Sequence, residues 1–441
     1  MTTSANLDAV IIGAGPAGSA AAILLARAGW AVALVEKQRF PRRKVCGECI
    51  AASNLPLLDA LGIGAAFAAN AGPALRRVTL LHERQQVSAD LPAADHGHHP
   101  WGRALGREWL DSMLLEQARA AGANVLQPWS VMELRQASGI WHCKLRAVDS
   151  GAVLTLRAAM LIDAHGAWQS LGTDQPLVPA APAAADLFAF KANFSGAALR
   201  TDTISVLALD GGYGGMVVAD GGVTTVACCI RRDRLHGARR ASPAKRAGDA
   251  IETWLRRQSA GVGLALQDAT REGQWLAAGP IRPGVRIRAN DKFFRIGNAA
   301  GEAHPILGEG ISMALQSAAL LCSHLLGDRP GARVPGDVPH DELQRRYEFD
   351  WHRHFDARLR IAATFAQVAM HPWSAAGLMS LAGHWPRLLT RGARWGGKVC
   401  TAATPAQFQQ RKPASARHPQ HVAPAPLASY PPLPTTKSGK A

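Results

Sequence analysis

Two cysteines, Cys46 and Cys49, stand three positions apart in the stretch RRKVCGECI, which spans residues 42–50. A pair at this spacing can belong to a metal site, form a redox-active disulfide, or line a cofactor site. A zinc site needs about four ligands, and the sequence has no second Cys-x-x-Cys motif or paired histidine motif. We therefore predict no metal site, and the choice between the other two functions depends on the surrounding motifs.

A glycine motif precedes the cysteines in LDAVIIGAGPAGSAAAILLARAGWAVALVEKQ. The pattern predicts a strand, a helix and a second buried strand over residues 8–12, 19–28 and 31–35. The motif Gly13-x-Gly15-x-x-Gly18 permits a tight turn and a close approach of the backbone to a pyrophosphate, whose charge a helix N-terminus favours. Glu36 follows the second strand and can accept hydrogen bonds from an adenosine ribose. This unit predicts a dinucleotide cofactor, and the alternative is a glycine-rich packing turn.

A second glycine-rich segment, RIGNAAGEAHPILGEGISMALQSAALL, lies near residue 300. Gly297 and Asn298 end a predicted strand, and Pro305-x-x-Gly308-x-Gly310 opens a predicted helix that starts near Ile311. The positive end of this helix would favour the negative charge that collects at the N1–C2=O edge of a reduced flavin. Asn298 could bond a ribityl hydroxyl or a phosphate. We therefore predict FAD rather than NAD as the resident cofactor, with an ordinary loop before a helix as the alternative.

The chain resembles the FAD-dependent superfamily of aromatic hydroxylases, geranylgeranyl reductases and flavin-dependent halogenases. The stretches that carry this resemblance are VIIGAGPAGSAAAILLARAG, FPRRKVCGECI, GREWLDSMLLEQARAAGANV, LIDAHGAWQS and IGNAAGEAHPILGEGISMALQSA. FPRRKVCGE is most similar to the geranylgeranyl reductases. The resemblance implies that Arg107 contacts FAD and that residues 42–47 run past the flavin ring. With the motifs above, it predicts a cofactor site made of Gly13, Gly15, Ala17, Gly18, Glu36, Lys37, Arg42, Lys44, Cys46, Gly47, Arg107, Gly297, Asn298, Gly308, Gly310 and Ile311.

The sequence also departs from this family in three places. Asn298 stands where the family usually has Asp, and His165 stands where the hydroxylases have Asp in their Asp-Gly motif. The Tyr-x-Trp-x-Phe-Pro substrate motif of the geranylgeranyl reductases is missing, and GGYGGMVVADGG occupies its place. We expect no second dinucleotide unit, so NADPH or NADH would bind only transiently as the electron donor.

The cysteines can now be interpreted within this family. Disulfide reductases with a similar first unit space their cysteines more widely and carry a second glycine motif, so a thiol-redox function is disfavoured. We predict that Cys46 lies beside the flavin and lines the substrate cavity, while Cys49 packs; the alternative is that both only pack. Cys46, Pro305 and Gly308 are the residues predicted to lie closest to the reaction. His165 and His304 either meet the cofactor or substrate or are hydrogen-bonded loop residues.

The fold predicted from these elements is α/β, with a Rossmann-like, GR2-type FAD-binding domain, an inserted antiparallel β-sheet substrate domain and C-terminal helices. Other expected elements are a helix over 103–125, a strand over 160–163, an antiparallel sheet over 186–231, an amphipathic helix over 243–258, a strand over 293–296, and two short helices within 361–383 on either side of His371. The predicted division is a discontinuous FAD-binding domain (1–77, 101–172 and 280–328), a sheet domain (78–100 and 173–279), a helical region (329–400) and a disordered basic tail (401–441).

The formal charge of +16 is concentrated at the C-terminal end. From residue 357 onward the chain has eleven Lys and Arg and no Asp or Glu. Such a region can bind nucleic acid or an anionic membrane, or remain solvated and disordered. Few aromatic residues separate the charges of the tail and no nucleic-acid motif occurs, so we expect no nucleic-acid partner. Peripheral membrane contact around Trp373, Trp385 and Trp395 is the remaining possibility.

The sequence shows no secretory signal, no membrane span and no disulfide framework, which predicts a cytoplasmic protein that could contact the inner face of a membrane. The leading functional hypothesis is a FAD-dependent monooxygenase of specialised metabolism. In it, reduced flavin and oxygen form a C4a-hydroperoxide that hydroxylates a small apolar or aromatic substrate. The rival is C=C reduction of an isoprenoid-like lipid, in which Cys46 donates or steers a proton. A non-catalytic binder of anionic surfaces is the third hypothesis.

Overall fold

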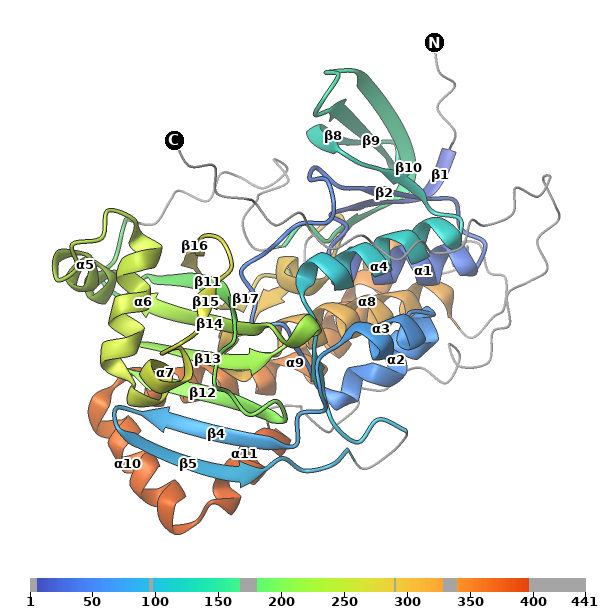
Figure 1. Ribbon diagram of the computed structural model, residues 1–441. Helices are drawn as coiled ribbons and strands as arrows, with labels where there is room; N and C mark the ends of the chain where they lie inside the picture. Colours follow the sequence, from blue (N-terminus) through green and yellow to red (C-terminus); the bar gives the residue numbers. More distant parts are fainter. Residues whose placement is uncertain (1–5, 95–97, 167–180, 289–290, 328–338, 396–441) are drawn as a thin grey trace.

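The computed structural model describes residues 6–94, 98–166, 181–288, 291–327 and 339–395. The described chain contains two large β-sheets (Figure 1). The expected tail, residues 401–441, lies outside the described residues, as do part of the expected sheet domain and the start of the expected C-terminal region. The predicted domain division therefore stays a prediction.

The first sheet has a parallel centre. Its order is β7 (Asn124–Leu126), β2 (Val32–Val35), β1 (Asn6–Ile12), β10 (Val153–Asp163), β9 (Ile140–Ala147) and β8 (Trp129–Ala137), and β18 (Phe294–Arg295) also pairs with β10. Strands β7, β2, β1, β10 and β18 are parallel, with Ile12 in register with both Val35 and Asp163. Because parallel strands end at the same edge, the loops after β1, β2, β10 and β18 meet there.

Three helices cover one face of this sheet, namely α1 (Pro16–Arg27), α4 (Arg107–Ala120) and α8 (Gly310–Leu326) (Figure 1). Helix α1 begins at a proline, which lacks the N–H that the first helical position leaves unpaired. Ala20, Ala21 and Ala22 of α1 are fully buried, and their small side chains allow α4 and α8 to pack on either side of it. Two shorter helices, α2 (Leu55–Leu61) and α3 (Gly64–Asn70), extend this layer.

The second sheet covers the site. Its order is β15 (Thr270–Arg271), β11 (Leu187–Ser195), β14 (Thr224–Arg231), β13 (Gly212–Val218), β12 (Thr203–Leu209), β4 (Arg77–His82) and β5 (Gln85–Asp90), and β16 (Leu276–Ile281) pairs with β11. It is antiparallel as expected, except that β4 and β12 are parallel. One face packs against α5 (Arg232–Arg240), α6 (Ala247–Gln258) and α7 (Ala260–Ala265). Two short ladders, β3 (Cys49–Ile50) with β6 (Arg103–Ala104) and β17 (Gly284–Val285) with β19 (Gly301–Glu302), join the loops.

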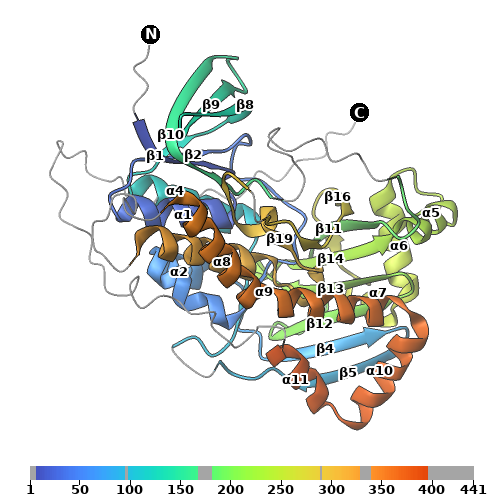
Figure 2. The same ribbon diagram turned by 180° about the vertical axis from the view of Figure 1, so that it is seen from behind.

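Helix α9 (His340–Met370) runs across the molecule and contacts α8, β12 and β13 (Figure 2). Its buried side chains repeat every three or four residues, as a helix stripe requires: Tyr347, Trp351, Phe355, Leu359, Ala362 and Ala366. The chain then turns at His371 into α10 (Pro372–His384) and α11 (Arg387–Trp395). The predicted break at His371 is confirmed, but the helix before it has 31 residues and is not short.

Three other predicted elements had wrong boundaries. The helix expected from residue 103 begins at Arg107, because Arg103 and Ala104 pair with Ile50 and Cys49 as a strand. It ends at Ala120, before Gly122, which has a φ of +98°. The strand expected over 160–163 begins at Val153, because its first half pairs with β9. The helix expected from residue 243 begins at Ala247.

A buried carboxylate joins the two layers. Glu48 is 1% exposed and lies in the left-handed region with a φ of +61°. Its carboxylate pairs with Lys191 of β11 and accepts hydrogen bonds from Thr225 Oγ1 of β14 (2.6 Å) and the backbone N–H of Arg107 (3.0 Å). Burial raises the pKa of Glu48, whereas the charge of Lys191 opposes that rise. The loop before β3 is thereby fixed between the substrate-facing sheet and the start of α4.

We expect Glu48→Gln or Lys191→Met alone to lower the free energy of unfolding by about 3–5 kcal/mol, because each leaves a buried charge without its partner. The double variant should lose less than the sum of the two losses. Urea denaturation followed by circular dichroism measures these differences. Glu342→Gln is the matched control, because its partners Arg345 and Arg346 are exposed. Single-variant losses as small as that of the control would contradict the structural importance of the buried pair.

Candidate functional site

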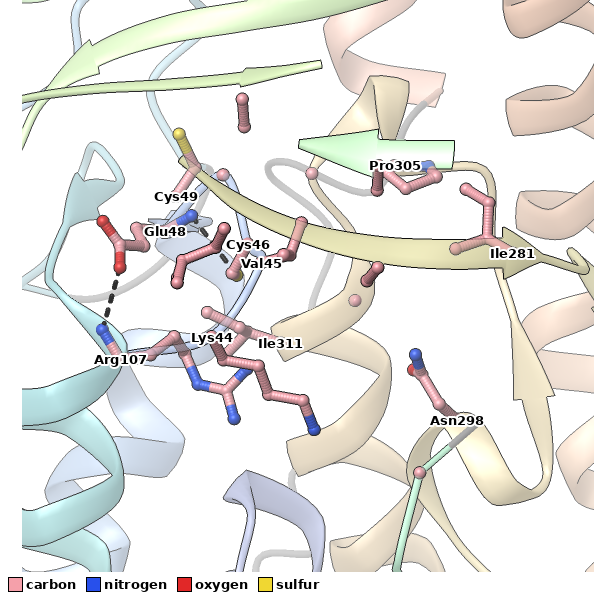
Figure 3. Close-up of a pocket in the computed structure, with 18 of the residues that line it drawn as sticks. Lys44, Val45, Cys46, Glu48, Cys49, Arg107, Ile281, Asn298, Pro305 and Ile311 are labelled. Atoms are coloured by element: carbon pink, nitrogen blue, oxygen red, sulfur yellow. Dashed lines mark hydrogen bonds between the residues drawn. The ribbon is translucent and has the colours of Figure 1, made fainter. Parts of the chain in front are cut away.

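A cavity of about 490 Å³ lies where the parallel strands of the first sheet end (Figure 3). The loops after β1, β2, β10 and β18 supply Gly13, Glu36, His165 and Gly297 to its wall. Strands β11–β14 and β16 of the second sheet supply the opposite wall. The position agrees with the general rule that ligands of such sheets bind outside the carboxyl ends of the strands.

The glycine motif forms a tight turn at this edge. Gly13 has a φ of +102°, which favours glycine, and a Cβ on it would lie 2.6 Å from the carbonyl oxygen of Ala164. A Cβ on Gly18 would lie 1.8 Å from the carbonyl oxygen of Gly13, so Gly18 is required for packing between turn and helix. Gly15 lies on the cavity wall, and a Cβ on it would approach only the Arg107 guanidinium, at 3.9 Å. The turn thus leaves its backbone open to a ligand.

Glu36 lies on the cavity wall with its carboxylate held in place. It accepts hydrogen bonds from the backbone N–H groups of Ala14 (3.0 Å) and Gln38 (2.8 Å), and Arg42 Nη2 lies 3.6 Å from it. The side chain is buried at 6% exposure. A carboxylate oxygen can accept more than one hydrogen bond, so this geometry leaves capacity for ribose hydroxyls.

Four cationic residues line the cavity; Arg43 pairs with Glu108 and Glu272, and the other three are Arg42, Lys44 and Arg107. Arg107 donates two hydrogen bonds to Asp111, both at 2.8 Å, and Arg42 Nη2 lies 3.6 Å from the same carboxylate. Burial disfavours the charge of Arg107, but Asp111 outweighs this effect and the pKa of Arg107 is raised. Asp111 therefore keeps a buried guanidinium charged and oriented at the cavity wall.

Lys44 differs from the two arginines, because the structure gives it no carboxylate within salt-bridge distance among the described residues. Burial, together with the charges of Arg107 and Arg42, lowers its pKa to about 8. Figure 3 shows the Lys44 and Arg107 side chains lying close together on this wall. Arg42, Lys44 and Arg107 outnumber the two carboxylates beside them, Glu36 and Asp111. Such a buried group of cations suits a doubly negative diphosphate, and these residues therefore fit the diphosphate of FAD.

The second glycine-rich segment reaches the cavity from the other side. Gly297 has a φ of +60° and donates its N–H to Ser317 Oγ (2.8 Å), while a Cβ on it would lie 2.9 Å from Ala17. Asn298 lies on the wall, and its amide donates to Glu302 (3.3 Å). Helix α8 begins at Gly310, and Gly310 and Ile311 lie on the wall, so the N-terminus of the helix, with its unpaired N–H groups, borders the cavity.

The two cysteines of the opening motif have different surroundings. Cys46 is half-buried on the cavity wall, where its sulfur accepts a hydrogen bond from the Glu48 N–H (3.3 Å) and interacts with Arg107 (Figure 3). Cys49 is 8% exposed within the short strand β3. Both are free thiols. Cys49 also lies on the cavity wall and therefore does more than pack. That Cys46 lies beside the flavin and takes part in the reaction stays a prediction.

The opposite wall is mostly apolar. Gly214 and Gly215 of β13 lie on it, and a Cβ on either would lie 3.0 Å or less from the backbone carbonyl oxygen of a neighbouring strand, so close strand packing favours glycine there. Around them are Ala189, Ile204, Val206, Val217, Ala278 and Ile281. Ser205 and Tyr213 are polar residues of this wall, and the Tyr213 hydroxyl is hydrogen-bonded to His304 Nδ1 (3.2 Å). Burial raises the pKa of Tyr213 and lowers that of His304, so both are neutral near pH 7.

Most predicted site residues lie on this one cavity: Gly13, Gly15, Ala17, Glu36, Arg42, Lys44, Cys46, Gly47, Arg107, Gly297, Asn298, Pro305, Gly308, Gly310 and Ile311. Two do not: Gly18 packs behind the turn, and Lys37 is exposed beyond the end of β2. His165 lies on the wall and hydrogen-bonds Asp163, whereas His304 reaches the cavity only through Tyr213.

Sequence reasoning missed Glu48, Lys191 and Tyr213. Glu48 belongs to no motif of its own, because it stands between Cys46 and Cys49. Its partner Lys191 is a single charge within the apolar run LFAFKANF. An isolated lysine in such a run is a usable signal, because a buried charge requires a partner. Tyr213 stands between two pairs of glycines in GGYGG, a composition that indicates close backbone packing.

Two further searches concern the described residues alone. No group of three or more His, Cys, Asp and Glu side chains there is arranged to hold a metal ion. None of the helices in that part of the chain combines the length and apolar character needed to cross a bilayer.

Comparison with known proteins places the chain among flavoproteins. Residues 6–334 match the family described as FAD binding domain. A menaquinone reductase of Mycobacterium tuberculosis is 31% identical over 172 residues, which are 39% of this chain and 40% of the reductase. The chain thus matches less than half the length of that relative.

Solved structures share the fold over most of the chain. A myxobacterial chondrochloren halogenase superposes with a TM-score of 0.70 at 17% identity, covering 88% of this chain and 90% of the halogenase. A probable FAD-dependent monooxygenase of Pseudomonas aeruginosa, PqsL, superposes with a TM-score of 0.65 at 18% identity, covering 85% of this chain and 100% of PqsL. The family match covers well over half of the chain, so the chain belongs to the FAD-dependent oxidoreductase superfamily that includes the halogenases, aromatic monooxygenases and geranylgeranyl reductases.

Proposed function

We propose that this FAD-dependent oxidoreductase is a monooxygenase that acts on a small apolar or aromatic molecule. The observation that carries the proposal is one cavity with two chemically different walls. Arg42, Lys44 and Arg107 line one part of it, and the apolar face of β11–β14 lines another. Bound FAD would supply the redox chemistry, so the protein itself needs no nucleophile or acid–base pair.

The cationic wall would hold the cofactor by its polar parts. In this proposal Glu36 accepts hydrogen bonds from the adenosine ribose, and Arg42, Lys44 and Arg107 hold the diphosphate. The N-terminus of α8, with Gly310 and Ile311 on the wall, faces the flavin ring. The contacts to the ribose and the diphosphate use parts of FAD that do not react, and the opposite wall is left free for a substrate.

The apolar wall would hold the substrate and keep water away from the reaction. Apolar side chains such as Ile204, Val206 and Val217 favour a ring or chain over a charged molecule. Tyr213, oriented by His304, could exchange one hydrogen bond with a hydroxyl or carbonyl oxygen of that molecule. Likeness of fold to PqsL, whose structure has been determined with 2-aminobenzoylacetate, supports a substrate of this size and character.

Reduction of a C=C bond is the second candidate function. The thiol of Cys46 lies on the cavity wall and interacts with the Arg107 guanidinium, so it could donate or steer a proton. The match to a menaquinone reductase also favours this candidate. Against it stands the absence from the sequence of the substrate motif of the prenyl reductases, which GGYGGMVVADGG replaces.

Rapid mixing of the reduced, FAD-loaded protein with oxygen distinguishes the two functions. We expect a transient absorbance that matches neither reduced nor oxidised flavin, because an apolar, water-excluding cavity protects oxygen chemistry on the cofactor from hydrolysis. Free reduced FAD is the control and should reoxidise without it. Two results together would favour the reductase over the monooxygenase. The first is single-step reoxidation with aromatic compounds present. The second is hydrogenation of an isoprenoid quinone by the wild type but not by Cys46→Ala.

The pH dependence of FAD affinity tests the function assigned to Lys44. Its pKa of about 8 in the structure would rise when a diphosphate binds beside it, so FAD favours the protonated form. Affinity should therefore be highest below pH 8 and fall by up to roughly tenfold between pH 7 and pH 9. Fluorescence titration of the apoprotein with FAD measures the dissociation constant.

The Lys44→Met variant should bind FAD more weakly at pH 7 and lose this pH dependence. Lys37→Met is the matched control, because Lys37 is exposed and lies outside the cavity, and it should behave as the wild type does. An unchanged pH dependence in Lys44→Met would show that Lys44 does not contact the cofactor.

A further inference from the structure

Helix α10 and the turn that follows it expose large apolar side chains at one end of the molecule. Trp373 is 92% exposed, Trp385 is 62% exposed and Leu381 is 44% exposed. Among the tryptophans whose exposure the structure describes, Trp373 and Trp385 are the exposed ones. Two exposed tryptophans at the two ends of one surface helix are unusual on a protein that contacts only water.

The composition of α10 strengthens this observation. Its sequence, PWSAAGLMSLAGH, contains no Lys, Arg, Asp or Glu. Only Ala375, Met379 and Ala382 are buried against the second sheet and α9. A surface helix usually carries charged residues on the face opposite its buried stripe. In α10 that face is apolar or weakly polar, so it suits surroundings less polar than bulk water.

Positive charges adjoin this apolar face. Helix α11 places Arg387, Arg391 and Arg394 at spacings of four and three residues, which puts them on one side of the helix, and all three are exposed. The chain has no Asp or Glu after Asp356 to offset them. Thr390 Oγ1 donates a hydrogen bond to the backbone oxygen of Asp90 (2.7 Å), which holds α11 against β5.

We propose that α10 and α11 form a docking surface for an anionic lipid bilayer, with Trp373, Leu381 and Trp385 in the interface and Arg387 and Arg391 against the lipid headgroups. Tryptophan favours the boundary between headgroups and acyl chains, and arginine on an adjoining helix adds attraction to anionic lipid. A second copy of the chain is a poorer occupant, because a symmetric contact would bring the positive charges of Arg387 and Arg391 toward the same charges of the other copy.

The docking surface lies beside the sheet that forms the apolar wall of the cavity. Helix α10 packs on β4, β5 and β12, and β12 also supplies Ile204 and Val206 to the cavity wall (Figure 2). Docking would therefore bring the substrate-facing sheet close to the bilayer, where apolar molecules accumulate. The inference rests on the surface alone and does not depend on which reaction the cavity performs.

Vesicle flotation with the full-length, FAD-loaded protein tests the proposal. The protein should float with vesicles of phosphatidylglycerol and phosphatidylcholine in equal parts, and not with phosphatidylcholine alone. Trp373→Ala/Trp385→Ala and Arg387→Glu/Arg391→Glu should each reduce the bound fraction at limiting lipid by at least about tenfold. The flavin spectrum of each variant confirms that it remains folded.

Two matched controls make the result specific to this surface. Phe349→Ala removes an aromatic side chain that is 69% exposed on α9, and Arg239→Glu/Arg240→Glu reverses two exposed charges on α5. Both controls should bind as the wild type does. Three results would overturn the proposal: no binding of the wild type, equal losses in the controls, or a dimer in light scattering that Trp373→Ala/Trp385→Ala converts to a monomer.

Discussion

The buried pair of Glu48 and Lys191 determines how the two halves of this protein meet. Glu48 belongs to the loop that lines the cofactor side of the cavity, and Lys191 belongs to the sheet that closes the other side. Glu48 and Lys191 are each 1% exposed, and a buried charge without a partner is strongly destabilising. Each residue therefore fixes the position of the other. Hydrogen bonds from Thr225 and the Arg107 N–H bring a third element, the start of α4, to the same carboxylate.

The cavity is a consequence of that arrangement. Its cationic residues come from the loop before Glu48 and from α4, whose first residue is tied to Glu48 through its backbone. Its apolar wall comes from the strands that carry Lys191 and Thr225. A cofactor held by Arg42, Lys44 and Arg107 would thus have a defined distance to the substrate wall.

Much of the cofactor wall was predictable, because its chemistry is encoded in short motifs. Gly13, Gly15 and Glu36 belong to one strand–turn–helix–strand unit, and Gly308 and Gly310 belong to one loop before a helix. Local spacing was enough to place both at the same sheet edge once a parallel sheet was assumed. Gly18 and Lys37 fell outside the cavity for local reasons, since one fills the turn and the other lies on the solvent side beyond β2.

The substrate wall was less predictable, because it depends on contacts between residues far apart in the chain. The pairing of Glu48 with Lys191 joins positions separated by 143 residues, and the bond between Tyr213 and His304 joins positions separated by 91. The predicted start of α4 was wrong for a similar reason. Arg103 and Ala104 stand shortly before the helix in the sequence, but they pair with β3 as a strand. Only the folded chain shows which of several suitable partners each residue meets.

The most direct test of this account is the crystal structure of the protein with FAD. We predict that the adenosine ribose lies on Glu36, the diphosphate lies beside Arg42, Lys44 and Arg107, and the flavin ring lies between the segment that contains Pro305 and the apolar face of β13. FAD bound with its ring away from β13, or no FAD in the cavity at saturating concentration, would contradict the assignment of the two walls.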